Sequence, residues 1–310
     1  LKCFQIIQEH QKMKRNILLN PGPATTTDTV KQALVVPDVC PREEEFGKIT
    51  QSVMQKIVDV VNGHSTHATV IFAGSGTAGV EAALSSVVSE NGKILILDNG
   101  AYGKRAETII QAYGISHKTI SIEWGEYPDI SQIETVIKEE PKLTHFFFVH
   151  HETTTGMLNP LTELLDLCEN YELDSIVDAM SSYAGLPIDL QKHQIDFLIS
   201  SSNKCIQGMA GISFVIANKK LLKATSKNPQ RNLYLNLWGN HSYIEQTGQF
   251  QFTPPVQIVY ALNQALDEFF KETQTGRTAR YVKSYETLLK GIEQTGLEML
   301  LPESQHSKLL

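Results

Sequence analysis

Short apolar runs alternate with helical patterns from Thr69 to Ala217, and this alternation constrains the fold more than any other feature of the sequence. The runs that predict strands are Thr69–Phe72, Lys93–Leu97, Lys118–Ile122, His145–His150, Ser175–Asp178, Asp196–Ser200 and Ile212–Ala217. From Val80 to Val88, apolar residues recur at the spacing of one buried helix face. Apolar strands separated by helices are typical of a parallel sheet buried on both faces. We therefore predict an α/β fold with a mostly parallel, seven-stranded sheet covered by helices on both faces.

One lysine lies in the most apolar part of this pattern. Lys204 follows the run Ile195–Ile199 and precedes the run Ile212–Ala217, so its side chain starts close to the protein interior. A buried ammonium group is costly to desolvate. Such a lysine pairs with a carboxylate, extends its amine to the surface, or reacts as an amine. Its position alone leaves all three alternatives open.

Two further motifs are expected at the same edge of the sheet. The segment FAGSGTAGVE (72–81) joins a strand to a helix, and its glycines and the hydroxyls of Ser75 and Thr77 suit a phosphate at the helix start. Asp178 closes the buried strand in SIVDAMSS. Plain helix or turn capping explains each motif when it is taken alone. Because ligands of open α/β sheets bind beyond the carboxyl ends of the strands, we expect both motifs to meet Lys204 in one crevice.

A phosphate site, a lysine and a carboxylate are together what pyridoxal phosphate requires. Its phosphate needs hydrogen-bond donors, its aldehyde needs an amine, and its pyridinium nitrogen needs a carboxylate so that the ring withdraws electrons. A nucleotide-binding fold would explain the phosphate site but not the lysine. The residues therefore predict a pyridoxal phosphate enzyme.

Composition narrows the classes of partner. The net charge is −7 and no long basic run occurs, which argues against a nucleic-acid partner or an anionic membrane surface. No apolar stretch approaches the roughly 20 residues of a membrane span, and no secretory signal is visible. The 4 cysteines have no CxxC spacing, which favours reduced thiols in the cytoplasm. The histidine pairs at 64/67 and 150/151 lack a matching acid or cysteine pattern, so no metal site is predicted.

Several longer strings support a family resemblance that runs from about Asn16 to about Leu300. They are NPGPATTT, AGSGTAGVEAAL, DNGAYGKRAE, HETTTGMLNP, VDAMSSYAG, SSNKCIQGMAG and FTPPVQIVYALNQAL. In this order and spacing they resemble the class V aminotransferases of the fold-type I pyridoxal phosphate group. Within that family, HETTTGMLNP and SSNKCIQG favour the subfamily that moves the amino group of 2-aminoethylphosphonate to pyruvate, giving phosphonoacetaldehyde and alanine.

The resemblance implies a role for each matching residue. Lys204 would join the cofactor's aldehyde and then shuttle the substrate proton, and Asp178 would pair with the pyridinium nitrogen. The other implied contacts are Ser75, Gly76 and Thr77 to the phosphate, Ser202 and Asn203 beside it, Tyr102 on the ring face and Thr153 near the ring hydroxyl. Thr253 would reach the phosphate of the neighbouring subunit, which implies a homodimer with shared active sites. Without the family, Tyr102 is explained by packing on a helix start and Thr253 by a helix N-cap before Pro254.

Substrate recognition and domain limits are expectations of the same kind. A phosphonate dianion calls for hydroxyl and backbone donors with an arginine, and we expect Thr25, Thr26 and Thr27 to supply part of that contact. Residues 1–15 are predicted to be a tail or linker, 16–270 the large cofactor-binding domain, and 271–310 the start of a truncated C-terminal small domain. In the relatives that small domain carries an arginine for the substrate's acid group, which this sequence does not reach. Two alternatives stay open: an alanine- or serine-glyoxylate type of class V aminotransferase, and a non-catalytic binding subunit.

Overall fold

The structure is a computed structural model that describes residues 16–309, so the predicted tail or linker at 1–15 lies outside the described residues. The helices are α2 (Asp28–Gln32), α3 (Glu44–Asp59), α4 (Gly76–Val87), α5 (Ala101–Ala112), α6 (Ile130–Glu139), α7 (Leu161–Asn170), α8 (Lys219–Ala224), α9 (Leu237–Thr247), α10 (Val256–Glu272) and α11 (Gln274–Thr295). The strands are β1 (His67–Ala73), β2 (Lys93–Asp98), β3 (His117–Ser121), β4 (Leu143–Val149), β5 (His151–Glu152), β6 (Met157–Leu158), β7 (Asp174–Asp178), β8 (Phe197–Ser201) and β9 (Ile212–Asn218).

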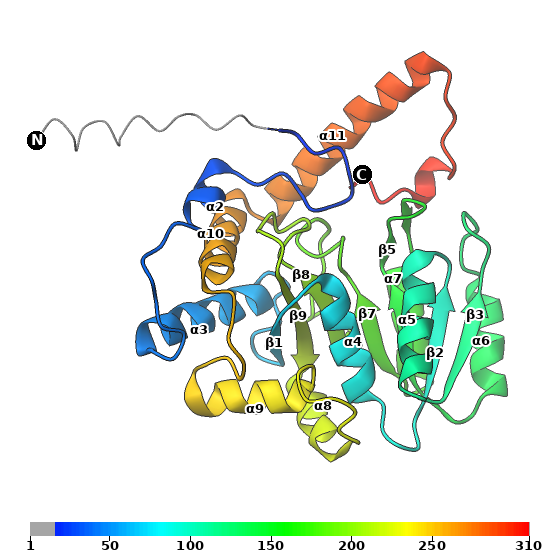
Figure 1. Ribbon diagram of the computed structural model, residues 1–310. Coiled ribbons are helices and arrows are strands. Elements are labelled where there is room, and N and C mark those ends of the chain that lie inside the picture. The colour runs from blue at the N-terminus through cyan, green and yellow to red at the C-terminus, as the bar shows by residue number, and fades with distance from the viewer. Residues whose placement is uncertain (1–15, 310) are drawn as a thin grey trace, which may run out of the picture.

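All of the predicted strands join one 7-stranded sheet, in the order β1-β9-β8-β7-β4-β2-β3 (Figure 1). The pairings from β3 to β8 are parallel, whereas β9 runs antiparallel to both β8 and β1. The prediction of a mostly parallel sheet is therefore confirmed. Strand β9 is reversed because residues 202–211, which link it to β8, contain no crossover helix, so the chain turns straight back.

Helices cover both faces of the sheet, as the apolar strands require (Figure 1). Successive strand residues point to opposite sides: Ile94 and Ile96 pack with α4 and α5, whereas Leu95 and Leu97 belong to the core under α3, α6, α7 and α10. The helical stripe predicted from Val80 lies on α4 and is buried. One apolar core thus lies on each face of the sheet, and each contains residues of β1, β2, β4, β7, β8 and β9.

From Val256 to Thr295 the chain is helical, in α10 and α11. Helix α10 ends at Glu272 and α11 begins at Gln274, after a residue in the left-handed region (Thr273, φ 71°). The described chain then returns to the 156–157 loop, where the Ser307 amide donates to the Gly156 carbonyl at 3.1 Å. Whether a domain boundary falls at 270 stays a prediction.

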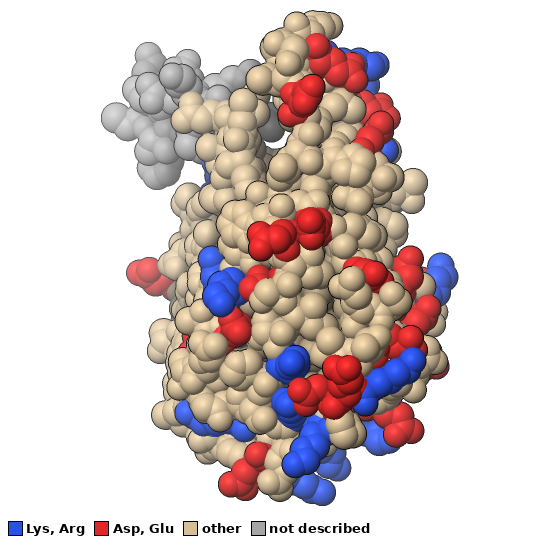
Figure 2. All heavy atoms as spheres, turned by 90° about the vertical axis from the view of Figure 1, so that its right-hand side faces the viewer, with Lys and Arg blue, Asp and Glu red and all other residues tan. Residues whose placement is uncertain are grey.

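The surface at the β3 edge of the sheet carries acidic and basic side chains side by side (Figure 2). Ion pairs there join Lys93 to Glu140 at 2.6 Å and Lys138 to Glu134 at 3.1 Å. Between residues 16 and 309, no helix has the length and apolar character to cross a membrane.

Candidate active site

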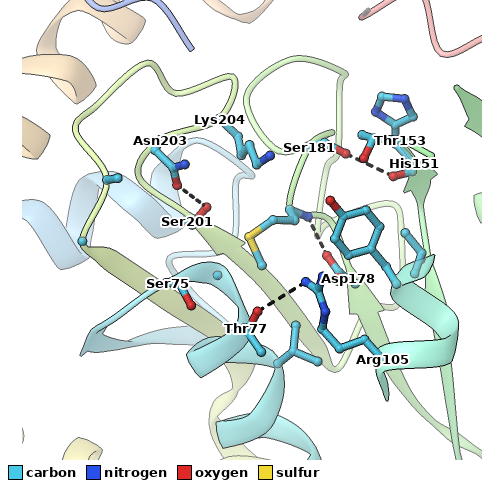
Figure 3. Close-up of a pocket in the computed structure, with 17 residues that line it drawn as sticks. Ser75, Thr77, Arg105, His151, Thr153, Asp178, Ser181, Ser201, Asn203 and Lys204 are labelled. Atoms are coloured by element: carbon cyan, nitrogen blue, oxygen red, sulfur yellow. Dashed lines mark hydrogen bonds between the residues drawn. The ribbon is translucent and has the colours of Figure 1, made fainter. Parts of the chain in front are cut away.

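The carboxyl ends of β1, β2, β4, β7 and β8 lie at one edge of the sheet, because β9 is the single reversed strand. The loops beyond them surround a cavity of about 170 Å³. Of the residues predicted from the sequence, those that line it are Ser75, Gly76, Thr77, Tyr102, Thr153, Asp178, Asn203 and Lys204. Figure 3 shows Lys204 and Asn203 on the β8–β9 loop, with Ser75 and Thr77 at the start of α4. The predicted crevice therefore exists.

The start of α4 offers hydrogen-bond donors to the cavity. Ser75 is the N-cap residue, but its hydroxyl makes no capping hydrogen bond, and no acidic side chain lies in the first turn. The first amides of a helix have no partner within the helix and carry its positive dipole end. Arg105 of α5 adds a cation here, since its guanidinium donates to the Thr77 hydroxyl at 3.3 Å. This corner of the cavity suits a phosphate.

Asp178 is a buried carboxylate at the end of β7 with one oxygen engaged. It is 3% exposed, and its Oδ1 accepts from the Met180 amide at 2.9 Å. Burial, reinforced by the nearby Glu152 carboxylate, raises the pKa of Asp178 to about 6, although Arg105 and Lys204 oppose the rise. A buried acid in this state is stabilised as an anion by an added cation. The cavity wall at Asp178 therefore favours a positively charged ligand group.

Lys204 extends from the loop between the antiparallel strands β8 and β9. Its amine donates to the Pro21 carbonyl at 3.4 Å, and the Gly22 backbone lies directly on its side chain. A Cβ built at Gly22, where φ is +146°, would lie 2.6 Å from the Lys204 Nζ. The Pro-Gly-Pro segment thus covers the lysine. Among the described residues no carboxylate forms an ion pair with the Lys204 amine, so the first of the three alternatives, pairing with a carboxylate, is not what the structure shows.

Glu152 and Tyr102 connect the β4 and β2 ends of the site. Glu152 is fully buried, and its carboxylate accepts from the Tyr102 amide at 3.2 Å and from the Thr154 amide at 3.1 Å. The guanidinium carbon of Arg105 lies 4.8 Å from the centre of the Tyr102 ring. Glu152 therefore fixes the first turn of α5, and with it the aromatic ring and the arginine.

His151 also lines the cavity and is an unusual buried polar group. It is 2% exposed, and neither ring nitrogen has a hydrogen-bond partner within residues 16–309. Burial, with smaller contributions from His150 and Lys204, lowers the pKa of His151 to about 3. The ring is therefore neutral near pH 7. Among the described residues, no cluster of three or more histidine, cysteine or acidic side chains forms a metal site.

Comparison with known protein families identifies the family of this chain. The family model described as Aminotransferase class-V matches residues 29–308. The chain belongs to the class V aminotransferases. It is accordingly a pyridoxal phosphate-dependent enzyme, as the lysine, acid and phosphate site predicted.

Named relatives of this aminotransferase agree with that family. The chain is 40% identical to a 2-aminoethylphosphonate–pyruvate transaminase of Klebsiella pneumoniae over 297 residues, which are 95% of this chain and 80% of the relative. It is 37% identical to the enzyme of the same name from Pseudomonas fluorescens, covering 95% and 79%. Among solved structures, alanine–glyoxylate aminotransferase from Nostoc sp. matches with a TM-score of 0.89 and 25% identity, covering 97% of this chain and 80% of that one.

The cavity of this aminotransferase fits the cofactor on structural grounds. The unengaged Asp178 oxygen suits the protonated ring nitrogen, the uncapped start of α4 suits the phosphate, and Lys204 supplies the amine. One chain thus supplies the amine, the acid and the helix start that the cofactor requires.

Some of the predicted residues lie away from the cavity. Ser202 is fully buried, and its hydroxyl donates to the Met209 and Ile212 carbonyls, so its side chain does not line the cavity. Its expected position beside the phosphate stays a prediction. The neighbouring Ser201 lines the cavity instead, because successive residues at a strand end point to opposite faces.

The threonines after the Pro-Gly-Pro turn are also not part of the cavity lining. Thr25 accepts from the Leu18 amide, and Thr27 caps α2 and donates to Glu268. Their expected contact with the substrate stays a prediction. Thr253 is exposed and outside the cavity of its own chain, and Pro255 is the α10 N-cap residue, so capping does not explain Thr253. Its contact with a neighbouring subunit stays a prediction.

Sequence reasoning missed several residues of the cavity. They are Arg105, His151, Met180, Ser181 and Ser201. Arg105 follows Tyr102 by one helical turn, so the helical period from Tyr102 was a usable signal. Met180 and Ser181 follow Asp178 directly, but nothing in their residue types marks them as ligands.

Proposed function

We propose that this aminotransferase moves the amino group of 2-aminoethylphosphonate to pyruvate in the cytoplasm, giving phosphonoacetaldehyde and alanine. Relatives of that name that match 92–95% of the chain at 37–40% identity support the substrates. The observation that carries the chemistry is the convergence of Lys204, Asp178 and the start of α4 on one cavity. Pyridoxal phosphate would supply an electron-withdrawing ring that stabilises negative charge on the substrate carbon.

The proposed roles follow from where each side chain lies. Lys204 would hold the cofactor through its aldehyde, and the same amine would move the proton of the substrate carbon. This dual task requires a mobile side chain on a fixed backbone, which a lysine on a short loop provides. Asp178 pairs with the ring nitrogen, and the buried position of its carboxylate strengthens that pairing.

The remaining residues bind and orient. Ser75, Gly76, Thr77 and Asn203 hold the phosphate, and Arg105 neutralises it from beside Thr77. Tyr102 would pack against one face of the cofactor ring, and Thr153 would contact the ring hydroxyl. We propose a homodimer in which Thr253, exposed on its own chain, completes the phosphate site of the neighbouring subunit.

A donor-preference assay tests the proposal. The purified protein, saturated with pyridoxal phosphate, is incubated with pyruvate and either 2-aminoethylphosphonate or L-serine, and separately with glyoxylate and L-alanine. Product formation and donor loss are followed by NMR. We expect 2-aminoethylphosphonate to be the preferred donor by kcat/KM, and Lys204→Ala to lose both turnover and the visible cofactor absorption. Turnover of another donor with none from the phosphonate would refute the substrate. Cofactor binding without transfer from any donor would favour the binding-subunit alternative.

A further inference from the structure

Four successive backbone carbonyls around Lys204, those of residues 203–206, accept hydrogen bonds, although this segment is a loop. The Asn203 carbonyl accepts from the Ala24 amide at 2.8 Å, and the Lys204 carbonyl accepts from the Gln207 amide at 2.8 Å. The next two carbonyls belong to residues 205 and 206 and are held from outside the loop. A loop with four successive engaged carbonyls has little freedom to move.

A single side chain holds those next two carbonyls. Arg277 of α11 donates from one guanidinium nitrogen to the Cys205 carbonyl at 2.9 Å and to the Ile206 carbonyl at 3.2 Å. Arg277 is 2% exposed, which is rare for an arginine, and its guanidinium carbon lies 5.2 Å from the centre of the Phe269 ring. Its planar fork allows it to contact the two carbonyls while Nε remains free for an acid.

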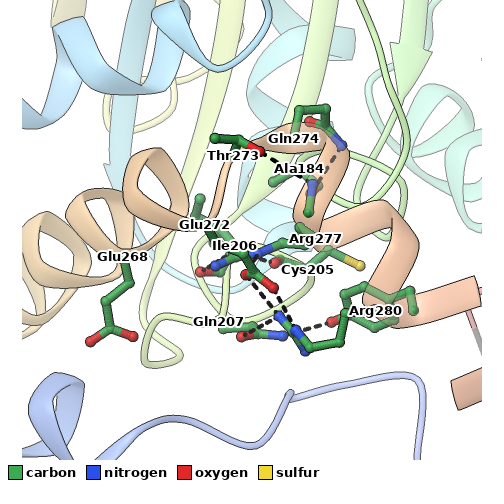
Figure 4. A network of polar contacts seen from close by, with 12 residues as sticks. Ala184, Cys205, Ile206, Gln207, Glu268, Glu272, Thr273, Gln274, Arg277 and Arg280 are labelled. Atoms are coloured by element: carbon green, nitrogen blue, oxygen red, sulfur yellow. Dashed lines mark hydrogen bonds and ion pairs between the residues drawn. The ribbon is translucent and has the colours of Figure 1, made fainter. Parts of the chain in front are cut away.

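That acid is Glu272, at the end of α10. Its carboxylate accepts from Arg277 Nε at 2.8 Å and from Arg280 Nε at 2.6 Å (Figure 4). Hydrogen bonds from Arg280 and then Arg277 lower the pKa of Glu272 to about 2, so it remains ionised. Glu272 therefore compensates the buried charge and fixes the orientation of the Arg277 fork.

The first turns of α11 hold the loop that follows β7 as well. The Thr278 hydroxyl donates to the Gly185 carbonyl at 2.8 Å, and the Gln274 amide donates to the Ala184 carbonyl at 3.4 Å. Ala184 itself has a positive φ of 64°. The start of α11 thus contacts two loops: the one after β8, which carries Lys204, and the one after β7, the strand that ends at Asp178.

We propose that Arg277 is a positioning residue for Lys204: by holding the Cys205 and Ile206 carbonyls, it fixes the backbone from which the lysine extends into the cavity. The proposal rests on the attachment of the cofactor to Lys204, and the test below separates the two. Arg277 does not line the cavity, so it acts through the loop and not on the substrate.

The test compares Arg277→Lys with Arg280→Lys. Lysine keeps the charge at 277 but lacks the fork that reaches an acid and two carbonyls together. Arg280 shares Glu272 but is 47% exposed, and it contacts the loop only at the Gln207 side chain (3.3 Å) and neither carbonyl, so it is the matched control. In the apo-protein, hydrogen exchange of the 203–208 amides reports the loop directly. In the holoenzyme, the pH midpoint of the cofactor absorption band, kcat and KM report the lysine.

For Arg277→Lys we expect exchange of the 203–208 amides to be at least about tenfold faster. We expect kcat to fall roughly 10- to 100-fold, with KM changed much less, because misplacement of a reacting group by about 1 Å has effects of this size. The band midpoint should move by about half a pH unit or more. Arg280→Lys should leave all three close to the wild-type values.

Equal exchange, kcat and band midpoint in the two variants, with only a lower melting temperature for Arg277→Lys, would overturn the proposal and leave a structural role. If Arg277→Lys does not fold, Glu272→Gln removes the charge that orients the fork, and an unchanged band midpoint there would overturn it equally. Lys204→Ala separates this inference from the proposed function. If that variant keeps the band, the cofactor attachment is wrong. If it loses the band and Arg277→Lys resembles the control, only the positioning role is wrong.

Discussion

Glu152→Gln tests how the site holds its aromatic ring. The carboxylate is fully buried and accepts from the Tyr102 amide at 3.2 Å, from the Thr154 amide at 3.1 Å and from the Thr154 hydroxyl at 2.6 Å. Tyr102 is in the first turn of α5, so the carboxylate also faces the positive end of that helix. The site is tight, since a Cβ built at Gly100 would lie 2.3 Å from the Glu152 carboxyl carbon.

Glutamine keeps the volume of the side chain and one acceptor oxygen. When that oxygen stays on Thr154, the amide nitrogen faces the Tyr102 N–H, and two donors then oppose each other. The lost hydrogen bond to a charged group accounts for about 1.5–3 kcal/mol. The lost interaction with the helix end adds about 0.3–1 kcal/mol. We expect the free energy of unfolding to fall by about 2–4 kcal/mol.

Urea unfolding of the apo-protein at neutral pH, followed by circular dichroism, measures this change. The matched control is Glu163→Gln, an exposed acid in the first turn of α7, for which we expect a change within about 0.5 kcal/mol. A second readout is Asp178, whose pKa is raised in part by Glu152. Its pKa should fall in Glu152→Gln. If Glu152→Gln and Glu163→Gln are equally stable, the assigned role of the Glu152 carboxylate is wrong.

Three further outcomes are expected. Burial raises the pKa of Asp178 to about 6, so cofactor affinity, measured by absorbance titration, should weaken as the pH falls through about 6. Asp178→Asn should remove this pH dependence, and an identical pH profile in the variant would contradict the assigned role of Asp178. Gly22→Ala should slow cofactor attachment at least about tenfold, because the new Cβ would lie 2.5 Å from the Lys204 Cδ. Gly114→Ala is the control: it is also at positive φ, but its Cβ would meet nothing within 4 Å, so only stability should change. Equal attachment rates in the two variants would count against the contact between Gly22 and Lys204. The pKa of Glu272 is lowered to about 2, chiefly by its hydrogen bond with Arg280. Its contribution to stability should therefore be present above the unfolded-state pKa and be lost as the pH falls toward 2. If acid unfolding of Glu272→Gln matches that of the wild type, the network contributes nothing to stability.

Gly22 and Gly114 show that the residue type alone does not predict what a glycine contacts. Both have positive φ, yet only Gly22 faces a reactive side chain. The Pro-Gly-Pro segment lies against Lys204, and the contact joins positions 22 and 204, which are 182 residues apart in the sequence. No local pattern encodes a contact of that range.

The sequence by itself determined the strands, the helices between them and the residues at the strand ends. Apolar periodicity and β-branched runs are local properties, and the carboxyl end of a strand is fixed once the strand is, so Ser75, Asp178 and Lys204 were predicted at one edge. Only the tertiary structure decided which neighbouring side chain faces the cavity, as with Ser201 and Ser202. It also decided the reversal of β9, the buried Glu152 behind Tyr102, and the hold of Arg277 on the lysine loop. These depend on packing between distant segments, where orientation and burial are set by the whole fold and not by the residues next in the chain.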